Sequence, residues 1–161
     1  MRAVVGRVLF LGLLLASRLD ASQDAVKHDR VDVFVLALEE AARVKAGVAG
    51  DEVVVPGDER LLRRALRNLL ENARRYGGDD VEVQVTAVPG GGAEVRVCDR
   101  GPGVPATHRE RIFEPFFCLP GHAEREGGVG LGLSLVRQIA TRHRGSVRCD
   151  ERPGGGSCFV L

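Results

Sequence analysis

The chain has 161 residues, enough for one domain with a buried core and too few for two large ones. Hydrophobic residues make up 44% of it and charged residues 28%, a composition typical of a soluble globular protein. The net charge of +1 gives no electrostatic reason to expect a nucleic acid as a partner.

The first feature along the chain is an apolar run at residues 8–16, which has two interpretations. One is the apolar segment of a signal peptide. The run is too short for a confident membrane span, and Arg7 lies just before it. We favour the other interpretation, the last turns of a packed helix that ends at residues 17–20. The polar residues 21–30 are then predicted to be a linker.

Two helices and a short strand are predicted next. Residues 31–44 mix strand and helix signals, and a helix is best supported over residues 36–46. Three valines at 53–55 predict the strand. Asp58 is a good N-cap, and the residues after it have a broad apolar stripe at helical spacing, so a helix is predicted over 59–76.

The remaining predicted elements are a β-hairpin, a turn-rich segment, a helix and a second hairpin. Alternating apolar residues on either side of glycine-rich turns indicate the hairpins, and an apolar stripe indicates the helix. This order predicts an α+β fold with helices on one face of a mixed sheet. The segments are 81–85 with 93–97, 100–130 with a short helical piece near 108–113, 131–143, and 146–149 with 157–161.

The four cysteines, at positions 98, 118, 149 and 158, lack the spacing of a zinc site. Free thiols in a reducing cytoplasm are the simplest interpretation, and the sequence leaves a disulfide open.

The predicted helix over 59–76 carries two amides one turn apart, Asn68 and Asn72. At about 100° per residue, Asn72 projects at the margin of the apolar stripe and Asn68 just outside it. Amides are mediocre helix formers and poor core residues, so the pair is either incidental on a surface helix or presents ligands. The Asn72 oxygen would suit Mg²⁺, whose shell phosphates and waters complete.

Three further segments each have a functional and an ordinary interpretation. Asp99, followed by Gly101 and Gly103, would place a carboxylate at the bottom of a pocket, where it accepts a hydrogen bond from an exocyclic amine, or it forms an ordinary turn. The glycine-rich residues 127–133 open a helix and suit bound phosphate, or they form a hinge; they match neither a Walker loop nor Gly-x-Gly-x-x-Gly. The phenylalanine-rich residues 111–117 are a local core or the anchor of a mobile lid.

In this order the segments resemble the ATP-binding catalytic domain of bacterial two-component sensor histidine kinases, within the Bergerat-type superfamily shared with gyrase. The resemblance covers residues 31–161 and implies a two-layer α/β sandwich. Each motif alone is weak, whereas five in order are specific. The motifs are Asn-Leu-Leu-Glu-Asn-Ala at 68–73, Asp-x-Gly-x-Gly at 99–103, Phe-Glu-Pro-Phe-Phe at 113–117, Gly-Val-Gly-Leu-Gly-Leu at 128–133, and Gly-x-Gly-Ser at 154–157.

The resemblance implies roles for individual residues. Asn72 corresponds to the Mg²⁺ ligand and Asp99 to the acceptor for the adenine amine. Asn68 occupies the position of a catalytic glutamate in ATP-hydrolysing relatives, and Arg75 that of a lysine that contacts phosphate. We therefore expect Asn68 and Arg75 to be catalytic, and residues 104–127 to form the ATP lid. The implied ATP-binding residues are Asn72, Tyr76, Asp99, Gly101, Gly103, Gly128, Gly130, Leu131, Gly132, Leu133 and Ser157.

The resemblance also implies a domain organisation. Residues 14–20 resemble the end of the second dimerisation helix, so residues 1–20 are expected to be a remnant of that domain, 21–30 a linker and 31–161 the catalytic domain. None of the four histidines has the sequence context of a phosphoacceptor. We therefore expect the domain to bind Mg·ATP and to phosphorylate a histidine on another chain.

The expected location is the cytoplasm, where a membrane-anchored parent kinase would also place its catalytic domain. The expected partners are a dimerisation domain that carries the phosphoacceptor and a response regulator, with possible self-association through residues 8–16 and no nucleic acid. Two alternatives remain. A serine kinase of the anti-sigma-factor type shares the ATP site, although the ending at residues 17–20 argues against it. The other is a non-catalytic module that binds a nucleotide or a partner.

Overall fold

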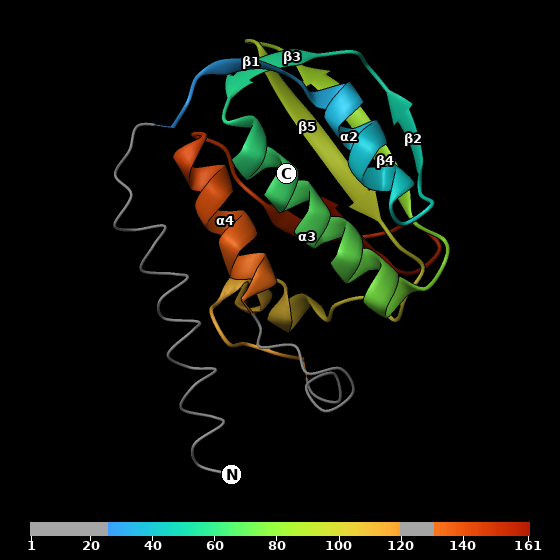
Figure 1. Ribbon diagram of the computed structural model, residues 1–161. Helices are drawn as coiled ribbons and strands as arrows, with labels where there is room; N and C mark the ends of the chain where they lie inside the picture. Colours follow the sequence, from blue (N-terminus) through green and yellow to red (C-terminus); the bar gives the residue numbers. More distant parts are fainter. Residues whose placement is uncertain (1–25, 120–130) are drawn as a thin grey trace, which may run out of the picture.

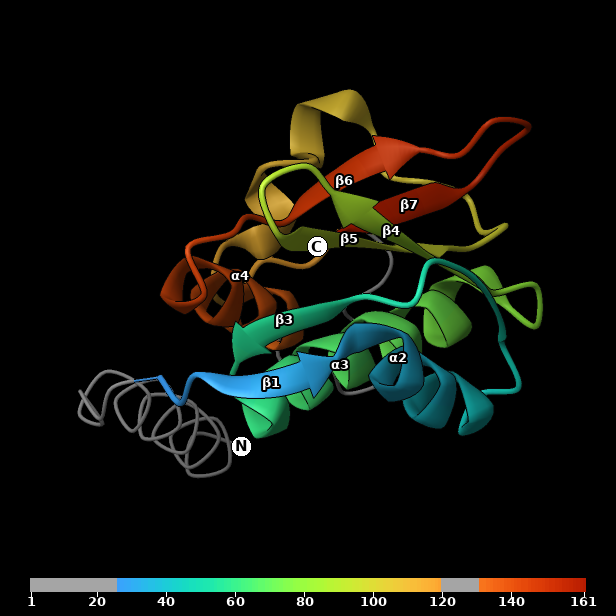
Figure 2. The same ribbon diagram turned by 90° about the horizontal axis from the view of Figure 1, so that it is seen from above.

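The computed structural model describes residues 26–119 and 131–161. Their strands form a five-stranded sheet with the order β2-β4-β5-β7-β6 and a two-stranded β1-β3 ribbon. The helices lie on one face of the large sheet, so the described part has two layers (Figures 1 and 2). The apolar run at 8–16, and Gly128 and Gly130, lie outside the described residues.

The two predicted hairpins and the predicted helices over 36–46, 59–76 and 131–143 are confirmed within a few residues. The observed elements are β1 Asp29–Asp32, α2 Val33–Ala42, β2 Gly47–Gly50, β3 Val54–Gly57, α3 Glu59–Gly77, β4 Glu82–Val88, β5 Gly92–Cys98, the 3-10 turns Ala106–His108 and Arg111–Phe113, α4 Gly132–Arg142, β6 Arg148–Glu151 and β7 Ser157–Val160.

The first strands of the chain differ most from what the sequence predicts. β1 begins at Asp29, within the predicted linker, and pairs antiparallel with β3. Asp32 ends β1 and caps α2 by accepting a hydrogen bond from the Val35 N–H at 3.0 Å, which starts that helix earlier than its apolar pattern suggests. β2, which was not predicted, is short and glycine-flanked and pairs in parallel with β4. The boundary between linker and catalytic domain stays a prediction.

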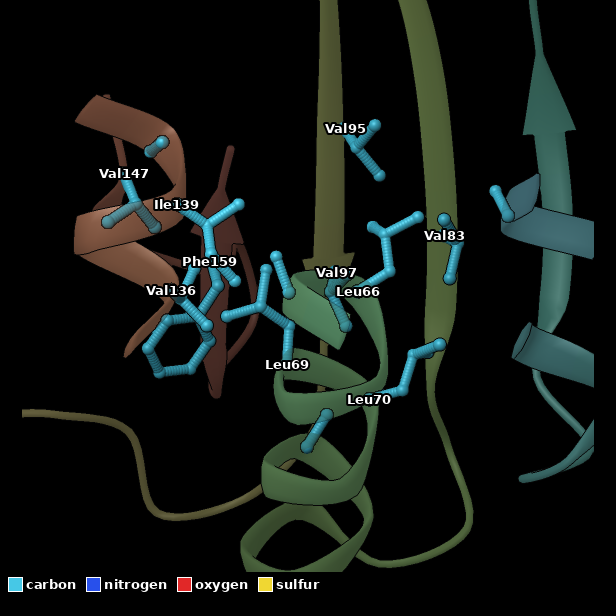
Figure 3. Close-up of a cluster of buried hydrophobic side chains, with 14 of the residues drawn as sticks. Leu66, Leu69, Leu70, Val83, Val95, Val97, Val136, Ile139, Val147 and Phe159 are labelled. Atoms are coloured by element: carbon cyan, nitrogen blue, oxygen red, sulfur yellow. The ribbon is translucent and has the colours of Figure 1, made fainter. Parts of the chain in front are cut away.

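The core lies between the sheet and the three helices. α3 buries Leu66, Leu69 and Leu70 against the valines of β4 and β5, as its apolar stripe predicts (Figure 3). α4 adds Val136 and Ile139 beside α3 and near β7 (Figure 3). Burying one such side chain contributes about 1.5–3 kcal/mol, so α3 is held chiefly by its apolar face.

Polar contacts fix α3 at its start and along its side. Asp58 accepts hydrogen bonds from the N–H groups of Arg60 and Leu61 at 3.0 and 3.4 Å, which confirms it as the N-cap. Farther along, Glu40 of α2 is 2% exposed. It accepts hydrogen bonds from Arg67 at 2.9 and 3.0 Å and from Arg63 at 3.1 Å. These bonds, above all those from Arg67, lower the pKa of Glu40 although burial opposes them.

The free-thiol interpretation is wrong for two of the four cysteines. Cys98 and Cys158 are joined by a disulfide, whereas Cys118 and Cys149 are not disulfide-bonded. The bonded cysteines are partners in the register of β5 and β7, with Cα atoms 4.1 Å apart. They are separated by 60 residues in the sequence, so only the pairing of the strands brings them together.

Candidate functional site

A cavity of about 330 Å³ lies where the C-terminal half of α3, the start of α4 and the ends of β5 and β7 meet. It brings together most of the residues that the sequence suggested. Its predicted lining residues are Asn68, Asn72, Arg75, Tyr76, Asp99, Gly103, Leu131, Gly132, Leu133 and Ser157.

Asp99 follows β5 directly and is 3% exposed. Its Oδ1 accepts a hydrogen bond from the Gly101 N–H at 2.9 Å, and its own N–H donates to the Ser157 carbonyl at 2.9 Å. Burial raises the pKa of Asp99 above its ordinary value, while backbone hydrogen bonds from Gly101 and Ser157 and the charge of Arg152 oppose that rise. The site therefore holds a carboxylate in a poorly hydrated position, where a hydrogen bond from a ligand counts for more than in water.

The backbone crowds closely around Asp99. A Cβ on Gly77, at the end of α3, would overlap the Asp99 side chain, and one on Gly156 would overlap the Asp99 carbonyl. Gly101 does not line the cavity, and a Cβ there would overlap the Tyr76 carbonyl. Gly101 thus acts through close packing and through its N–H rather than by facing a ligand.

The two amides of α3 differ in their surroundings. Both side chains are half-buried and line the cavity. The Asn68 Nδ2 donates a hydrogen bond to the Gly132 carbonyl at 3.3 Å and so joins α3 to the first residue of α4. Asn72 lies one turn farther along α3, and its oxygen is the candidate ligand for a cation.

The start of α4 borders the same cavity. Leu131, Gly132 and Leu133 line it, and the Ser134 hydroxyl donates to the Leu131 carbonyl at 2.9 Å. No side chain among the described residues caps the N-terminus of α4. Amide groups at such an end suit an anion, so this part of the cavity fits phosphate.

The phenylalanine-rich segment serves both as a local core and as a wall of the cavity. Phe113 is buried and meets the ring of Phe159 edge to face, with centroids 6.3 Å apart. Phe117 lines the cavity, and its ring lies 4.7 Å from the guanidinium carbon of Arg111. Phe116 is 44% exposed and adopts a φ of 64°. The local-core interpretation is therefore confirmed for Phe113, whereas motion of a lid stays a prediction.

Several lining residues were not assigned to the site individually, although most of them belong to the predicted lid. Most of them are apolar residues of the turn-rich segment. Without helical or strand periodicity, a sequence pattern cannot show which of these side chains face a cavity. They are Glu71, Pro102, Val104, Ile112, Phe117, Cys118, Leu119 and Phe159.

Residues 57–161 match the family described as "Histidine kinase-, DNA gyrase B-, and HSP90-like ATPase". The chain belongs to this family. The sensor-like histidine kinase SenX3 of Mycolicibacterium smegmatis is 35% identical over 161 residues, covering 92% of this chain and 42% of that kinase. The chain thus spans less than half the length of this curated relative.

Two solved structures place this member of the family among the histidine kinases. The mycobacterial sensor histidine kinase MprB is 30% identical, has a TM-score of 0.72, and is aligned over 83% of this chain and 94% of its own. Full-length ShkA in complex with AMPPNP is 27% identical, also with a TM-score of 0.72, over 92% of this chain and 33% of ShkA. The chain is accordingly an ATP-binding catalytic domain of the histidine kinase type, and the α+β sandwich expected from the sequence is confirmed. Among the described residues, no helix is long and apolar enough to span a membrane.

Proposed function

We propose that this histidine kinase catalytic domain binds Mg·ATP in the cavity and transfers the γ-phosphoryl group to a histidine of a dimerisation domain on another chain. The observation that carries the proposal is the buried Asp99 in the lining of the cavity, which Asn72 and the start of α4 also line. A hydrogen-bond acceptor for adenine and an anion-binding helix end are the two features that an adenine nucleotide requires.

The residues present fit one magnesium ion that arrives with the nucleotide. Among residues 26–119 and 131–161, no three His, Cys, Asp or Glu side chains gather as a metal site. Asn72 would supply a single amide oxygen, and phosphate oxygens and water would complete the octahedral shell of Mg²⁺. When bound, the metal neutralises charge on the phosphates.

The protein would contribute to the reaction chiefly by positioning the nucleotide. Asp99 would hold the adenine, and the amides at the start of α4 together with Arg75 would orient and neutralise the phosphates. The amide of Asn68 cannot act as a general base, so we expect little activation of water and slow hydrolysis of ATP. The phosphoryl group would then pass in line to an imidazole nitrogen of the acceptor histidine, with ADP as the leaving group.

Isothermal titration of the chain with ATP and Mg²⁺ tests binding, and Asp99→Asn tests the assigned acceptor. Losing a hydrogen bond to a charged group should weaken ATP binding roughly 10- to 100-fold. Asp79→Asn is the matched control, because Asp79 is exposed and lies outside the cavity. Equal affinities of the wild type and Asp99→Asn would reject the proposal.

The acceptor and the cellular setting belong to the same proposal. We infer a phosphoacceptor domain and a response regulator as partners and the cytoplasm as the location, supported by the similarity to sensor kinases. Acid-labile phosphate on a supplied dimerisation domain would distinguish a histidine kinase from a serine kinase. ATP binding without any phosphotransfer would instead favour a non-catalytic module.

A further inference from the structure

The Cys98–Cys158 disulfide joins two cysteines that are each next in the sequence to a residue lining the nucleotide cavity. Cys98 ends β5 and precedes Asp99, and Cys158 follows Ser157 at the start of β7. Asp99 and Ser157 both line the cavity, and the Asp99 N–H donates to the Ser157 carbonyl. The covalent bond thus holds together the two strand ends that form this part of the cavity.

The pairing that it reinforces is short. β5 and β7 share three register pairs, at Arg96, Val97 and Cys98 of β5, and the disulfide joins the last of them. The hydrogen bond from the Asp99 N–H to the Ser157 carbonyl lies just beyond that pair. The end of a ladder is the first part to open when a strand frays. Without the disulfide, we expect Asp99 and Ser157 to separate more often.

The sulfur atoms are placed for exchange with a small thiol. Side chains alternate along a strand, so Cys98 and Cys158 point away from the face on which their neighbours Asp99 and Ser157 border the cavity. Cys98 is partly exposed, whereas Cys158 is 5% exposed. A thiolate in solution can therefore reach Cys98 without entering the nucleotide site.

The thiol on the neighbouring strand is a poor competitor for exchange. Cys149 lies on the neighbouring strand β6 and is buried. Burial raises the pKa of its thiol to about 11, so it stays protonated and unreactive near neutral pH.

We propose that Cys98 and Cys158 form a thiol–disulfide exchange site that controls the affinity of the cavity for nucleotide, an inference that rests on the proposed function. The oxidant is a low-molecular-weight disulfide such as oxidised glutathione. The Cys98 thiolate attacks it and expels one thiolate, and the Cys158 thiolate then attacks the Cys98 sulfur and expels the second. The expelled thiolates take up the two protons that the cysteines lose, so the dithiol and one small disulfide yield the protein disulfide and two small thiols.

The direction of control follows from the geometry. The disulfide form holds Asp99 against Ser157 and should bind nucleotide more tightly than the dithiol form. The hairpin after β6 is also fastened by Arg100, which donates to the carbonyls of Pro153 and Gly155 at 2.8 and 3.1 Å, so reduction should loosen the site rather than destroy it. In a reducing cytoplasm the dithiol would be the resting state, and oxidation would favour the nucleotide-bound domain.

The test uses the full chain, equilibrated either with oxidised glutathione or with dithiothreitol. Alkylation and mass spectrometry establish the state of each cysteine, and titration with ADP and Mg²⁺ measures the affinity. We expect roughly fivefold or greater weakening in the dithiol form, the lower range of a typical coupling between two sites. Circular dichroism shows whether both forms are folded at the temperature used.

Cysteine variants show whether the Cys98–Cys158 pair causes the change in nucleotide affinity. Cys98→Ser with Cys158→Ser should abolish the response to dithiothreitol, and Cys98→Ala with Cys158→Val serves if the serine pair does not fold. Cys118→Ser should keep the response, although Cys118 lines the cavity. Unchanged affinity while alkylation shows the pair opened, or a response lost with Cys118→Ser, overturns the inference. Absence of nucleotide binding in both redox states counts instead against the proposed function.

Discussion

The Nε2 atom of His143 accepts a hydrogen bond from the backbone N–H of Asp58 at 3.0 Å. The other ring nitrogen, Nδ1, lies 2.8 Å from the Ile139 carbonyl and must carry the proton to donate to it. The residue after the last turn of α4 is thereby fixed to the N-cap of α3. The two helices that border the cavity are thus fastened to each other at the end remote from it.

Replacing His143 by Ala should destabilise the fold by about 1–3 kcal/mol, because the Asp58 N–H would lose its partner in a half-buried position. Urea unfolding followed by circular dichroism measures the change. His28→Ala is the control, since His28 is exposed and should alter the free energy of unfolding by about 0.5 kcal/mol or less. Equal losses in the two variants would contradict the assigned contact.

The ion pairs of Glu40 with Arg63 and Arg67 predict a difference between the two adjacent glutamates of α2. Glu40→Gln leaves Arg63 and Arg67 without their buried partner and should cost about 2 kcal/mol, between the values for exposed and buried ion pairs. Glu39 also contacts Arg63, at 2.7 Å, but is 53% exposed. Glu39→Gln should therefore cost well under about 1 kcal/mol by the same unfolding measurement.

The same ion pairs make the free energy of unfolding depend on pH. Because the pKa of Glu40 is lower in the folded protein than its ordinary value of 4.5, its contribution is complete above that pH. It is lost as pH falls through the lowered folded pKa. The difference in the free energy of unfolding between the wild type and Glu40→Gln should be full at pH 6 and should shrink as the pH is lowered. A difference that stays constant with pH would argue against the assigned ion pair.

Gly77→Ala should weaken ATP binding about tenfold or more, because the new Cβ displaces the Asp99 side chain. Alanine itself is a better helix former than glycine, so intrinsic propensity does not explain a loss. Gly47→Ala is the control, since a Cβ there meets no atom within 4 Å. Comparison of the two affinities by titration decides the matter, and similar affinities would disprove the crowding around Asp99.

Sequence patterns predicted the parts of the fold that local physics determines. The stripe of α3 and its Asp58 cap follow from helical periodicity, and both hairpins follow from alternation around glycine. β2 was missed because four residues with two glycines carry no alternation, and its place comes only from parallel pairing with β4.

The features of the site also fall into two groups, those that a local pattern reveals and those that it does not. Asn68 and Asn72 were found because amides are unusual at their positions in a helix, and Asp99 was found because Gly101 and Gly103 follow it. The disulfide and the packing of Gly77 against Asp99 depend on strands and helices that approach from distant parts of the chain. No spacing of residues along the chain reports such approaches.

The close packing of Gly77 and Gly156 against Asp99 has a consequence for the redesign of this domain. Main-chain atoms pack closely around the carboxylate. A side chain added at these glycines would displace Asp99 and would not simply change the shape of the site. Altered nucleotide preference would have to be engineered from other lining residues, such as Val104 and Leu119, whose side chains can be replaced.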